Sequence, residues 1–347
     1  TANLSVIGYD PKEYYTGRSP LEALSIGVDM APTDVSFRCN LVTLSEEEER
    51  YEDKRILDHS SSEISTEDAA VLMETLMQEM RRGGYEFYTG TSYRHLLIHK
   101  FGSVVELTAP HDILTKRIGE YLPQDAVLRE MMETSYRILS NHPLNLERKA
   151  KGLNPANSVW FWGAGTRPML TSFEEKYHKK GAMISAVDLL KGIAVGAGLD
   201  NIIVEGANGG LHTNYTGKAE AAVDALAAQD YDFVYVHIEA PDEMGHQGSI
   251  PDKIKAIENI DQKIIGPIVG ELEDLCMDFR TLVLPDHPTP ICVRTHTGNP
   301  VPYLLYDSRK KAEGMPEYSE RLGNKSPLFE KEGHRLLSRL FEMDNER

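Results

Sequence analysis

Cysteine is scarce in this chain of 347 residues, where it occurs three times, at Cys39, Cys276 and Cys292. The three cysteines are far apart, odd in number, and form no Cys-x-x-Cys pair. This excludes the disulfide framework that staples small secreted proteins. We therefore expect a reducing compartment and predict a cytoplasmic location.

Long apolar runs are also absent. No uninterrupted apolar stretch approaches the roughly 18–20 residues that cross a bilayer, and no charged and then apolar leader opens the sequence. We expect a chain that has no membrane partner.

Basic residues are the minority, with 37 Lys and Arg against 54 Asp and Glu, for a net charge of −17. Nucleic-acid binders neutralise phosphates with clustered Lys and Arg, so this class is excluded. An anionic substrate must instead meet a local positive site. The chain is 41% apolar and 26% charged, which is typical of folded proteins. Its length predicts two domains, at roughly 100–200 residues each.

From about Asn157 onward, short apolar runs alternate with helical patterns, which is typical of a mostly parallel, doubly wound α/β sheet. A long amphipathic helix is expected over 251–275, because isoleucines recur there at helical spacing. Strands are expected at these positions: 158–163, 182–186, 201–206, 232–240, 280–286 and 301–307.

Between about Val35 and Ala150 the rhythm changes to two helices among several strands, which indicates a compact α+β unit. Residues 1–34 are too short to form a domain alone, so this unit is predicted to be an insertion. The predicted domains are 1–34 together with 151–347, and the inserted 35–150.

Asp and His follow three of the expected strands, at the edge where open α/β sheets place their sites. Asp242 and His246 lie four residues apart, Asp286 and His287 are adjacent between prolines, and His296 follows nine residues later. Mixed carboxylate and imidazole ligands suit divalent Mn, Zn, Co or Fe. The alternative is that the acids cap helices and the histidines only pack.

Long phrases of the chain resemble the archaeal-type cofactor-independent phosphoglycerate mutases of the alkaline phosphatase superfamily. They are TANLSVIGYDP, FRCNLVTL, WFWGAGTRP, HIEAPDEMGHQGS, LVLPDHPTP and RTHTGNPVP. The resemblance implies an alkaline-phosphatase-like α/β metal domain interrupted by a smaller domain that closes over the substrate.

The resemblance also implies two divalent ions, manganese first, with zinc, cobalt or magnesium as alternatives. Asp242, His246 and His296 would hold one ion, and Asp286 with His287 the other. In the family an N-terminal Asp and a nucleophilic Ser complete the second site. By register both fall upstream of Thr1, so we expect an N-terminal segment beyond this sequence and assign no catalytic nucleophile; Ser5 is not that serine.

An acidic chain that binds a small phosphorylated substrate needs cationic side chains facing its cleft. The candidates are Arg18 and Arg38, inside phrases that resemble the family, Arg94 with His95, and Lys218. For Arg18 and Arg38 an exposed surface charge is the alternative, and for Lys218 a solvated lysine at a helix start.

The predicted function is interconversion of 3-phosphoglycerate and 2-phosphoglycerate through a phosphoserine, in glycolysis and gluconeogenesis. A metal-dependent phosphatase, or a phosphotransferase acting on a small alcohol such as homoserine, is the near alternative, because fold alone does not fix the acceptor. A non-catalytic metal-binding scaffold is the alternative from another class. The sequence leaves homo-oligomerisation open.

Overall fold

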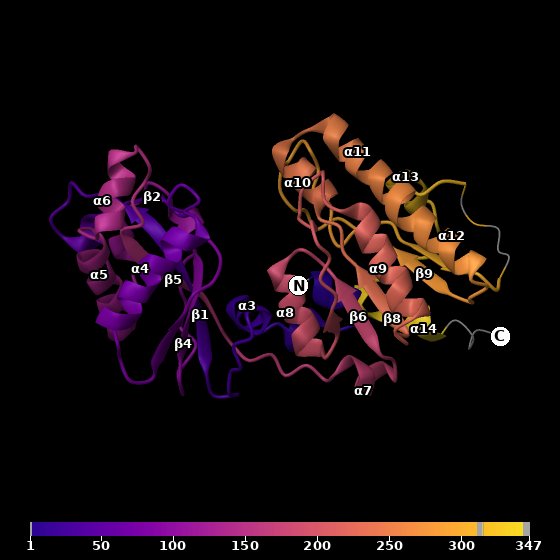
Figure 1. The fold of residues 1–347 in the computed structure, drawn as a ribbon, viewed down its shortest axis with the longest axis horizontal. Helices are drawn as coiled ribbons and strands as arrows, with labels where there is room; N and C mark the ends of the chain where they lie inside the picture. Colours follow the sequence, from indigo (N-terminus) through magenta and orange to yellow (C-terminus); the bar gives the residue numbers. More distant parts are fainter. Residues whose placement is uncertain (1, 311–313, 315, 343–347) are drawn as a thin grey trace. The chain divides into compact units, whose positions relative to one another are not determined.

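The computed structural model describes residues 2–310, 314 and 316–342 of the chain. It divides into two compact units: unit 1 contains Thr1–Tyr15 and Met169–Arg347, and unit 2 contains Thr16–Pro168. Both mix helices and strands, so the chain has a mixed α/β fold (Figure 1). Among the described residues no helix is both long and apolar enough to span a bilayer.

Unit 2 is built on an antiparallel sheet of five strands around β1, which pairs with β2, β4 and β5, while β3 pairs with β4. Every residue of β1 is buried, as expected of a strand that is paired on both edges and covered on both faces. Its elements are α3 Ser19–Ser25, β1 Val35–Leu44, β2 Ile56–Asp58, α4 Thr66–Glu79, β3 Tyr85–Tyr88, β4 Arg94–His99, α5 Ala126–Leu139, α6 Pro143–Ala150 and β5 Ser158–Thr166, with short 3₁₀ turns at Tyr51–Asp53, Pro110–Ile113 and Ile118–Tyr121.

The two faces of this sheet bury different side chains, because neighbouring residues of a strand point in opposite directions. Phe37 and Leu97 pack into the large core with α4 and α5. Leu96 and Ile98 pack on the other face with Ala23 of α3. Unit 2 therefore has a hydrophobic core of its own.

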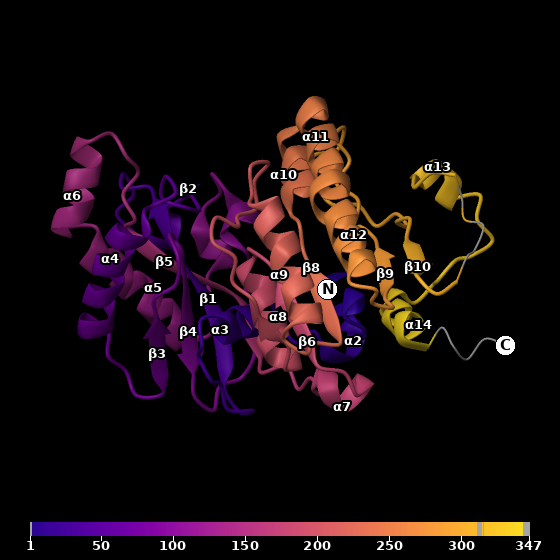
Figure 2. The same cartoon turned by 45° about the vertical axis from the view of Figure 1, so that its right-hand side comes forward.

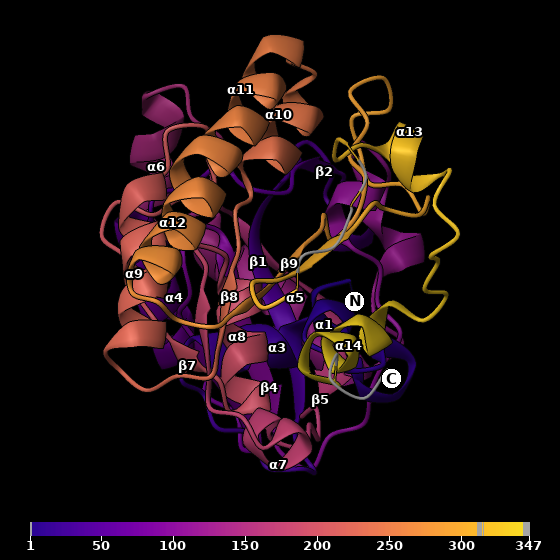
Figure 3. The same cartoon turned by 90° about the vertical axis from the view of Figure 1, so that its right-hand side faces the viewer.

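Unit 1 contains a parallel sheet in the order β7-β6-β8 and a separate antiparallel pair, β9 with β10. Helix α9 packs against β8 and against α12 (Figure 3), and α14 contacts β9 (Figure 2). Its elements are α1 Ala2–Val6, α2 Pro11–Tyr14, α7 Phe173–Tyr177, β6 Gly181–Ile184, α8 Asp188–Ala197, β7 Asp200–Asn201, α9 Tyr215–Ala227, β8 Phe233–Val236, α10 Ala240–Gln247, α11 Ile250–Ile260, a π-helical turn Asp261–Ile265, α12 Gly266–Asp274, β9 Arg280–Val283, β10 Leu304–Asp307, α13 Glu320–Gly323, a 3₁₀ turn Gly333–Arg335 and α14 Leu336–Glu342.

The unit boundaries differ from the predicted ones, which were 34/35 and 150/151. The structure places them at 15/16 and 168/169, because the flanking segments bond to β1. In the first segment, Ser19 Oγ donates to the carbonyl oxygen of Ser36 at 2.8 Å. In the second, β5 pairs along β1, with Ser158 opposite Val42. Segments 16–34 and 151–168 therefore belong to the inserted unit.

Candidate metal centre and anion-binding cluster

The five acids and histidines predicted from the sequence are delivered by helix α10 and by the loop that follows β9. Asp242 and His246 lie one helical turn apart on α10, so their side chains share one face of that helix. Asp286 and His287 come three and four residues after β9 ends, and His296 lies further along the same loop.

The structure brings three of the predicted histidines around Asp242. The Asp242 Oδ2 atom lies 3.3 Å from His246 Nε2, and its Oδ1 atom lies 3.3 Å from His296 Nε2. Oδ1 is also 3.9 Å from His287 Nδ1. The two imidazoles of His246 and His296 approach each other to 3.2 Å between their Nε2 atoms. One carboxylate is thus surrounded by three rings.

Asp286 joins the same cluster from the other side of His287, whose Nε2 atom lies 3.4 Å from Asp286 Oδ2. The amide of Asn3 in α1 donates to that oxygen at 3.0 Å, and Tyr235 in turn donates its hydroxyl to Asn3 Oδ1 at 2.7 Å. The imidazole of His287 therefore lies between two carboxylates rather than beside one.

The donor set fits a divalent ion. Ligand atoms of Asp242, His287 and His296 all lie within 4.8 Å of one another; ligands bonded at about 2.1 Å to one tetrahedral ion are roughly 3.4 Å apart. His246 Nδ1 lies 3.0 Å from the carbonyl oxygen of Arg294. That contact favours a proton on Nδ1 and leaves Nε2 free to bind a metal. The close trio takes members from both ligand sets that the family resemblance implies.

Sequence reasoning missed the residues that hold these ligands in place. Thr289 donates its hydroxyl to Asp242 Oδ1 through a short hydrogen bond. Lys253 of α11 donates to the backbone oxygen of Thr289 at 2.7 Å, and burial lowers the pKa of this lysine. A threonine three residues after an acid gives no signal in a sequence, because its role depends on where the loop turns.

Lys218 is buried near the same cluster, with only 1% of its surface exposed, so it is not the solvated lysine weighed as the alternative. Its ammonium donates to the carbonyl oxygen of His237 at 3.1 Å. Burial lowers the pKa of Lys218, and the nearby Glu239 opposes that shift. Burial also lowers the pKa of His237, to about 4, against the opposing charges of Asp286 and Asp242. A buried cation therefore accompanies the acids.

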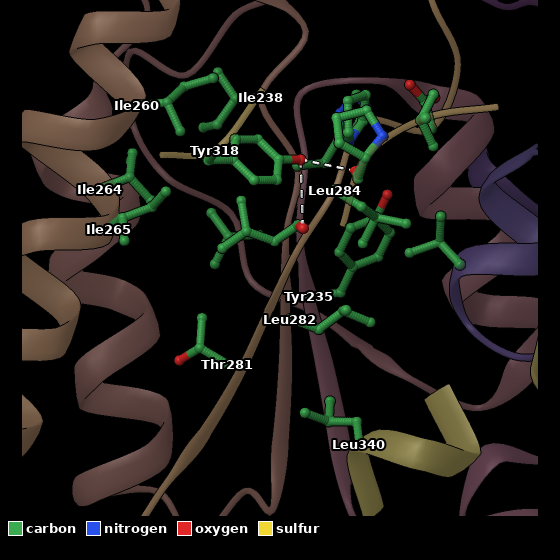
Figure 4. A pocket seen from close by; sticks show the side chains of 18 of the residues that line it. Tyr235, Ile238, Ile260, Ile264, Ile265, Thr281, Leu282, Leu284, Tyr318 and Leu340 are labelled. Carbon is green, nitrogen blue, oxygen red and sulfur yellow. Dashed lines mark hydrogen bonds between the residues drawn. The ribbon is translucent and has the colours of Figure 1, made fainter. Parts of the chain in front are cut away.

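A groove of about 1540 Å³ is lined by Asp286 and His287, by β8 and β9, and by the helical segment from α11 to α12. Across it the Tyr318 hydroxyl donates to the carbonyl oxygens of Val283 and Pro302, at 3.5 and 2.9 Å (Figure 4). Among the described residues, β8 is paired on its β6 edge and β9 on its β10 edge only. Apolar side chains line the walls: Ile238, Ile260, Ile264, Ile265, Leu282, Leu284 and Leu340.

A second charged cluster lies within unit 2. Arg18 and Arg38 both pair with Glu22, at 3.0 and 2.8 Å between Nε and the carboxylate oxygens. The Arg38 guanidinium stacks 4.2 Å above the Trp162 ring, and burial lowers its pKa. Arg94 lies on the same face of the sheet, since it is in register with Asn40, two residues beyond Arg38. The three predicted substrate-binding arginines are thus brought together.

His59 belongs to this cluster although sequence reasoning did not single it out. Its ring lies 6.1 Å from that of His111 and 5.9 Å from that of Tyr93, between centroids. The His111 ring in turn lies 5.2 Å from Trp162. Together with the arginines, these rings form an aromatic and cationic surface, the kind of surface that binds carboxylate and phosphate groups.

His95 is a predicted substrate residue of unit 2 that the structure does not bring to this cluster. It follows Arg94 on β4 and so points to the opposite, core face, where it is 2% exposed. Its Nδ1 atom accepts from the backbone N–H of Gly90 at 3.0 Å. The adjacency of Arg94 and His95 in the sequence therefore does not translate into a shared site.

Residues 1–145 match the model of a family described as 2,3-bisphosphoglycerate-independent phosphoglycerate mutase. A protein of that name from Methanosarcina barkeri is 50% identical over 332 residues, 93% of this chain and 81% of its own. A probable mutase of the same name from Geobacter sulfurreducens is 44% identical over 346 residues, 98% of this chain and 85% of its own.

Two solved structures are similar to this chain. A Pyrococcus horikoshii protein superposes with a TM-score of 0.77 at 29% identity, over 99% of this chain and 82% of its own. The cofactor-independent phosphoglycerate mutase from Thermoplasma acidophilum superposes with a TM-score of 0.64 at 25% identity, over 99% of this chain and 86% of its own.

Proposed function

The chain belongs to the 2,3-bisphosphoglycerate-independent phosphoglycerate mutases, and from that premise we propose how its residues share the work of this isomerase. The reaction moves one phosphoryl group between the 3- and 2-hydroxyls of glycerate. Because the reactant carries both a phosphate and a carboxylate, it needs cationic groups at two places. The metal cluster and Lys218 in unit 1, and the arginine cluster in unit 2, supply them.

In unit 1, Asp242, His246, His287, His296 and Asp286 are the residues that would hold divalent metal, with manganese as the expected ion. Bound cations would neutralise the negative charge on the phosphoryl oxygens. Two metals would fit the family pattern, since His287 lies between two carboxylates. The phosphoserine that the family resemblance implies remains a prediction, and we assign it to no described residue.

In unit 2, Arg38 and Arg18 are the proposed ligands of the substrate carboxylate or phosphate, with Arg94 as a third cation. The planar guanidinium of Arg38 is held against Trp162 and by Glu22, so its free N–H groups are oriented before substrate arrives. A fixed fork of donors matches the geometry of a carboxylate or phosphate. Closure of the inserted unit over substrate is part of the same proposal, because it would keep water from the phosphorylated enzyme.

The proposed architecture of unit 1 is the doubly wound sheet of the alkaline phosphatase superfamily. Parallel strands β6, β7 and β8 are joined through α8 and α9, as such a sheet requires. The groove between β8 and β9 has an unpaired strand edge on each side among the described residues. An extended strand laid along it would pair with both edges and join the two sheets into one.

The observation that carries the functional proposal is the meeting at Asp242 of helix α10 with two parts of the loop after β9. The phosphatase or homoserine-like phosphotransferase weighed from the sequence is not favoured, because the reported relatives are named as mutases. The same reaction would place the protein in glycolysis and gluconeogenesis, in the cytoplasm. Its proposed partner is the small phosphorylated substrate.

The test is an assay of protein expressed from its complete reading frame, with 3-phosphoglycerate as substrate and separate detection of 2-phosphoglycerate and inorganic phosphate. Formation of 2-phosphoglycerate, lost on chelation and restored by Mn²⁺, is the expected result. Asp242→Asn should abolish it, whereas Asp224→Asn, an exposed acid late in α9, should not. Inorganic phosphate as the sole product would reject the mutase assignment.

A further inference from the structure

The segment from Asp58 to Glu63 connects β2 to α4 through an unusual backbone. Three successive residues, Ser61, Ser62 and Glu63, have φ of 52°, 58° and 48°, and none of them is glycine. Left-handed backbone is unfavourable for residues with a Cβ, and successive residues rarely adopt it. Such strain persists only where the surrounding structure holds it, and it is concentrated at functional sites.

The carboxylate of Asp58 holds this turn from its first residue. Oδ1 accepts from the backbone N–H and the hydroxyl of Ser60, at 2.8 and 2.9 Å. Oδ2 accepts from the N–H of Ser62 at 2.6 Å and from the amide of Asn154 at 2.9 Å. Burial alone would raise the pKa of Asp58, yet these hydrogen bonds lower it to about 2, so the carboxylate is the form that the turn requires.

Arg148 of α6 fixes the far side of the turn. It is 4% exposed, and its Nη2 donates to the carbonyl oxygen of Ser61 at 2.7 Å while Nη1 pairs with Asp68 at 3.0 Å. The hydroxyl of Ser61 donates to the backbone of Leu41 in the central strand at 3.2 Å. The left-handed turn is therefore bonded to a helix and to the middle of the sheet.

The residue that this turn presents is His59. Its carbonyl oxygen accepts from Asn40 Nδ2 at 3.4 Å, and Asn40 Oδ1 accepts from the Trp162 indole at 3.0 Å. Trp162 is the ring on which Arg38 stacks. The backbone at His59 and the platform of Arg38 are thus tied to one buried amide. The ring contacts of His59 with His111, and of His111 with Trp162, place its imidazole in the same cluster as the guanidinium.

We propose that Asp58 is a positioning residue, which holds the left-handed turn 58–63 so that the His59 imidazole can donate a hydrogen bond to the anionic substrate beside Arg38. The inference rests on the proposed function, since it assumes that this cluster binds phosphoglycerate. Asp58 itself would not touch substrate, because both of its oxygens are occupied by the turn and by Asn154.

The test is a double-mutant cycle of Asp58→Asn and His59→Gln, measured as kcat and KM for 3-phosphoglycerate. Asp58→Asn should lower kcat/KM by roughly ten- to a hundredfold, mainly through KM, because the misplaced group binds substrate. In the His59→Gln background the same change should cost no more than about twofold. Asn154→Ala removes one hydrogen-bond donor from the Asp58 carboxylate and should show the same coupling to His59→Gln more weakly. It replaces Asp58→Asn in the cycle if that variant does not fold.

The matched control is Asp125→Asn, which weakens another carboxylate that accepts two backbone N–H groups in unit 2, at the start of α5. It should lower the melting temperature without changing KM. Equal losses for Asp58→Asn in both backgrounds, or wild-type kinetics for His59→Gln, would overturn the inference. A wild-type protein without mutase activity would overturn the proposed function instead, so the two failures are distinguishable.

Discussion

Asp242 accepts a short hydrogen bond from Thr289 and lies within 4 Å of three imidazoles, so its charge orients every predicted ligand near it. Each histidine binds a metal only while one ring nitrogen is deprotonated. Metal binding at this site must therefore weaken in acid, independently of the fold. Individual residues decide metal affinity here, because the ligand atoms of this trio belong to side chains.

His95 gives a prediction for folding stability at low pH. Burial lowers the pKa of its imidazole to about 3, against about 6.5 in an unfolded chain. Between these values the unfolded chain binds a proton that the folded chain does not. Stability should thus fall as pH drops from 6.5 towards 3, by up to about 1.4 kcal/mol per pH unit from this residue.

Urea unfolding of the wild type and of His95→Gln at several pH values from 7 to 4.5 isolates this contribution. The free energy of unfolding should fall less steeply with acidification in the variant, because the glutamine has no proton to gain while other groups titrate alike. Parallel stability curves for the two proteins would show that His95 does not remain neutral in the folded state.

The meeting of Asp242 and His246 with Asp286 and His287 could be predicted from sequence because each pair follows a recognisable strand, and strand ends meet at one sheet edge. Their role as metal ligands stays a prediction. The position of His59 could not be predicted, because it depends on the left-handed backbone of Ser61, Ser62 and Glu63. Nothing in a serine-rich sequence indicates that conformation. Arg94 and His95 show the converse error. Adjacent residues of a strand face opposite ways, so only one of them reached the cluster.

Among the elements, the helical segment from α11 to α12 shows what hydrophobic periodicity can predict and what it cannot. The recurring isoleucines predicted one helix over 251–275, and α11, the π turn and α12 together run from Ile250 to Asp274. The π turn was not predictable from apolar spacing. It lies directly before Pro267, which has no N–H to donate, and there the N–H of Gly266 bonds five residues back, to Asp261.

Strand pairing was the part of the fold that sequence could not give. The pattern at 158–163 correctly predicted a strand, but nothing local says that β5 pairs with β1 rather than with the parallel sheet. Similarly, Asn201 is the only residue of the strand expected at 201–206 that is paired in β7, together with Asp200 before it. Pairing depends on partners distant in sequence, which composition does not identify.

Gly245 links the packing of α10 to the metal cluster and gives a prediction for that helix. A Cβ at this position would lie 2.6 Å from the backbone oxygen of Thr289 and 2.9 Å from Lys253 Nζ. Backbone cannot yield as a flexible side chain can, so Gly245→Ala should displace the Thr289 loop and with it the Asp242 carboxylate. We expect a ten- to hundredfold loss of Mn²⁺ affinity, typical of a damaged supporting shell.

Calorimetric titration of this variant checks the prediction, with Gly270→Ala in α12 as the control, because a Cβ there meets nothing within 4 Å. Both changes favour helix by the same intrinsic amount. Mn²⁺ affinity equal in the two variants would show that α10 and the loop can separate without disturbing the site.

At the scale of the whole molecule, the chain combines a net charge of −17 with an anionic substrate, and it does so by gathering cations locally. Arg18, Arg38 and Arg94 are concentrated on one face of the unit 2 sheet, while Lys218 is buried in unit 1. Negative charge elsewhere would repel the substrate at low ionic strength. The two units thus each supply a positive site within an acidic protein.

Because all five candidate ligands lie in unit 1 and unit 2 has its own core, metal should stabilise one unit alone. An ion that binds only the folded form adds about 2.7 kcal/mol to unfolding at a hundredfold excess over its Kd. Thermal unfolding followed by hydrogen exchange should show unit 1 peptides shifting to higher temperature with Mn²⁺ and back with a chelator. The unfolding temperature of peptides from β1 and α5 in unit 2 should not change. Asp242→Asn should remove the shift and Asp224→Asn should retain it, whereas protection spreading equally to β1 would mean that the units unfold as one.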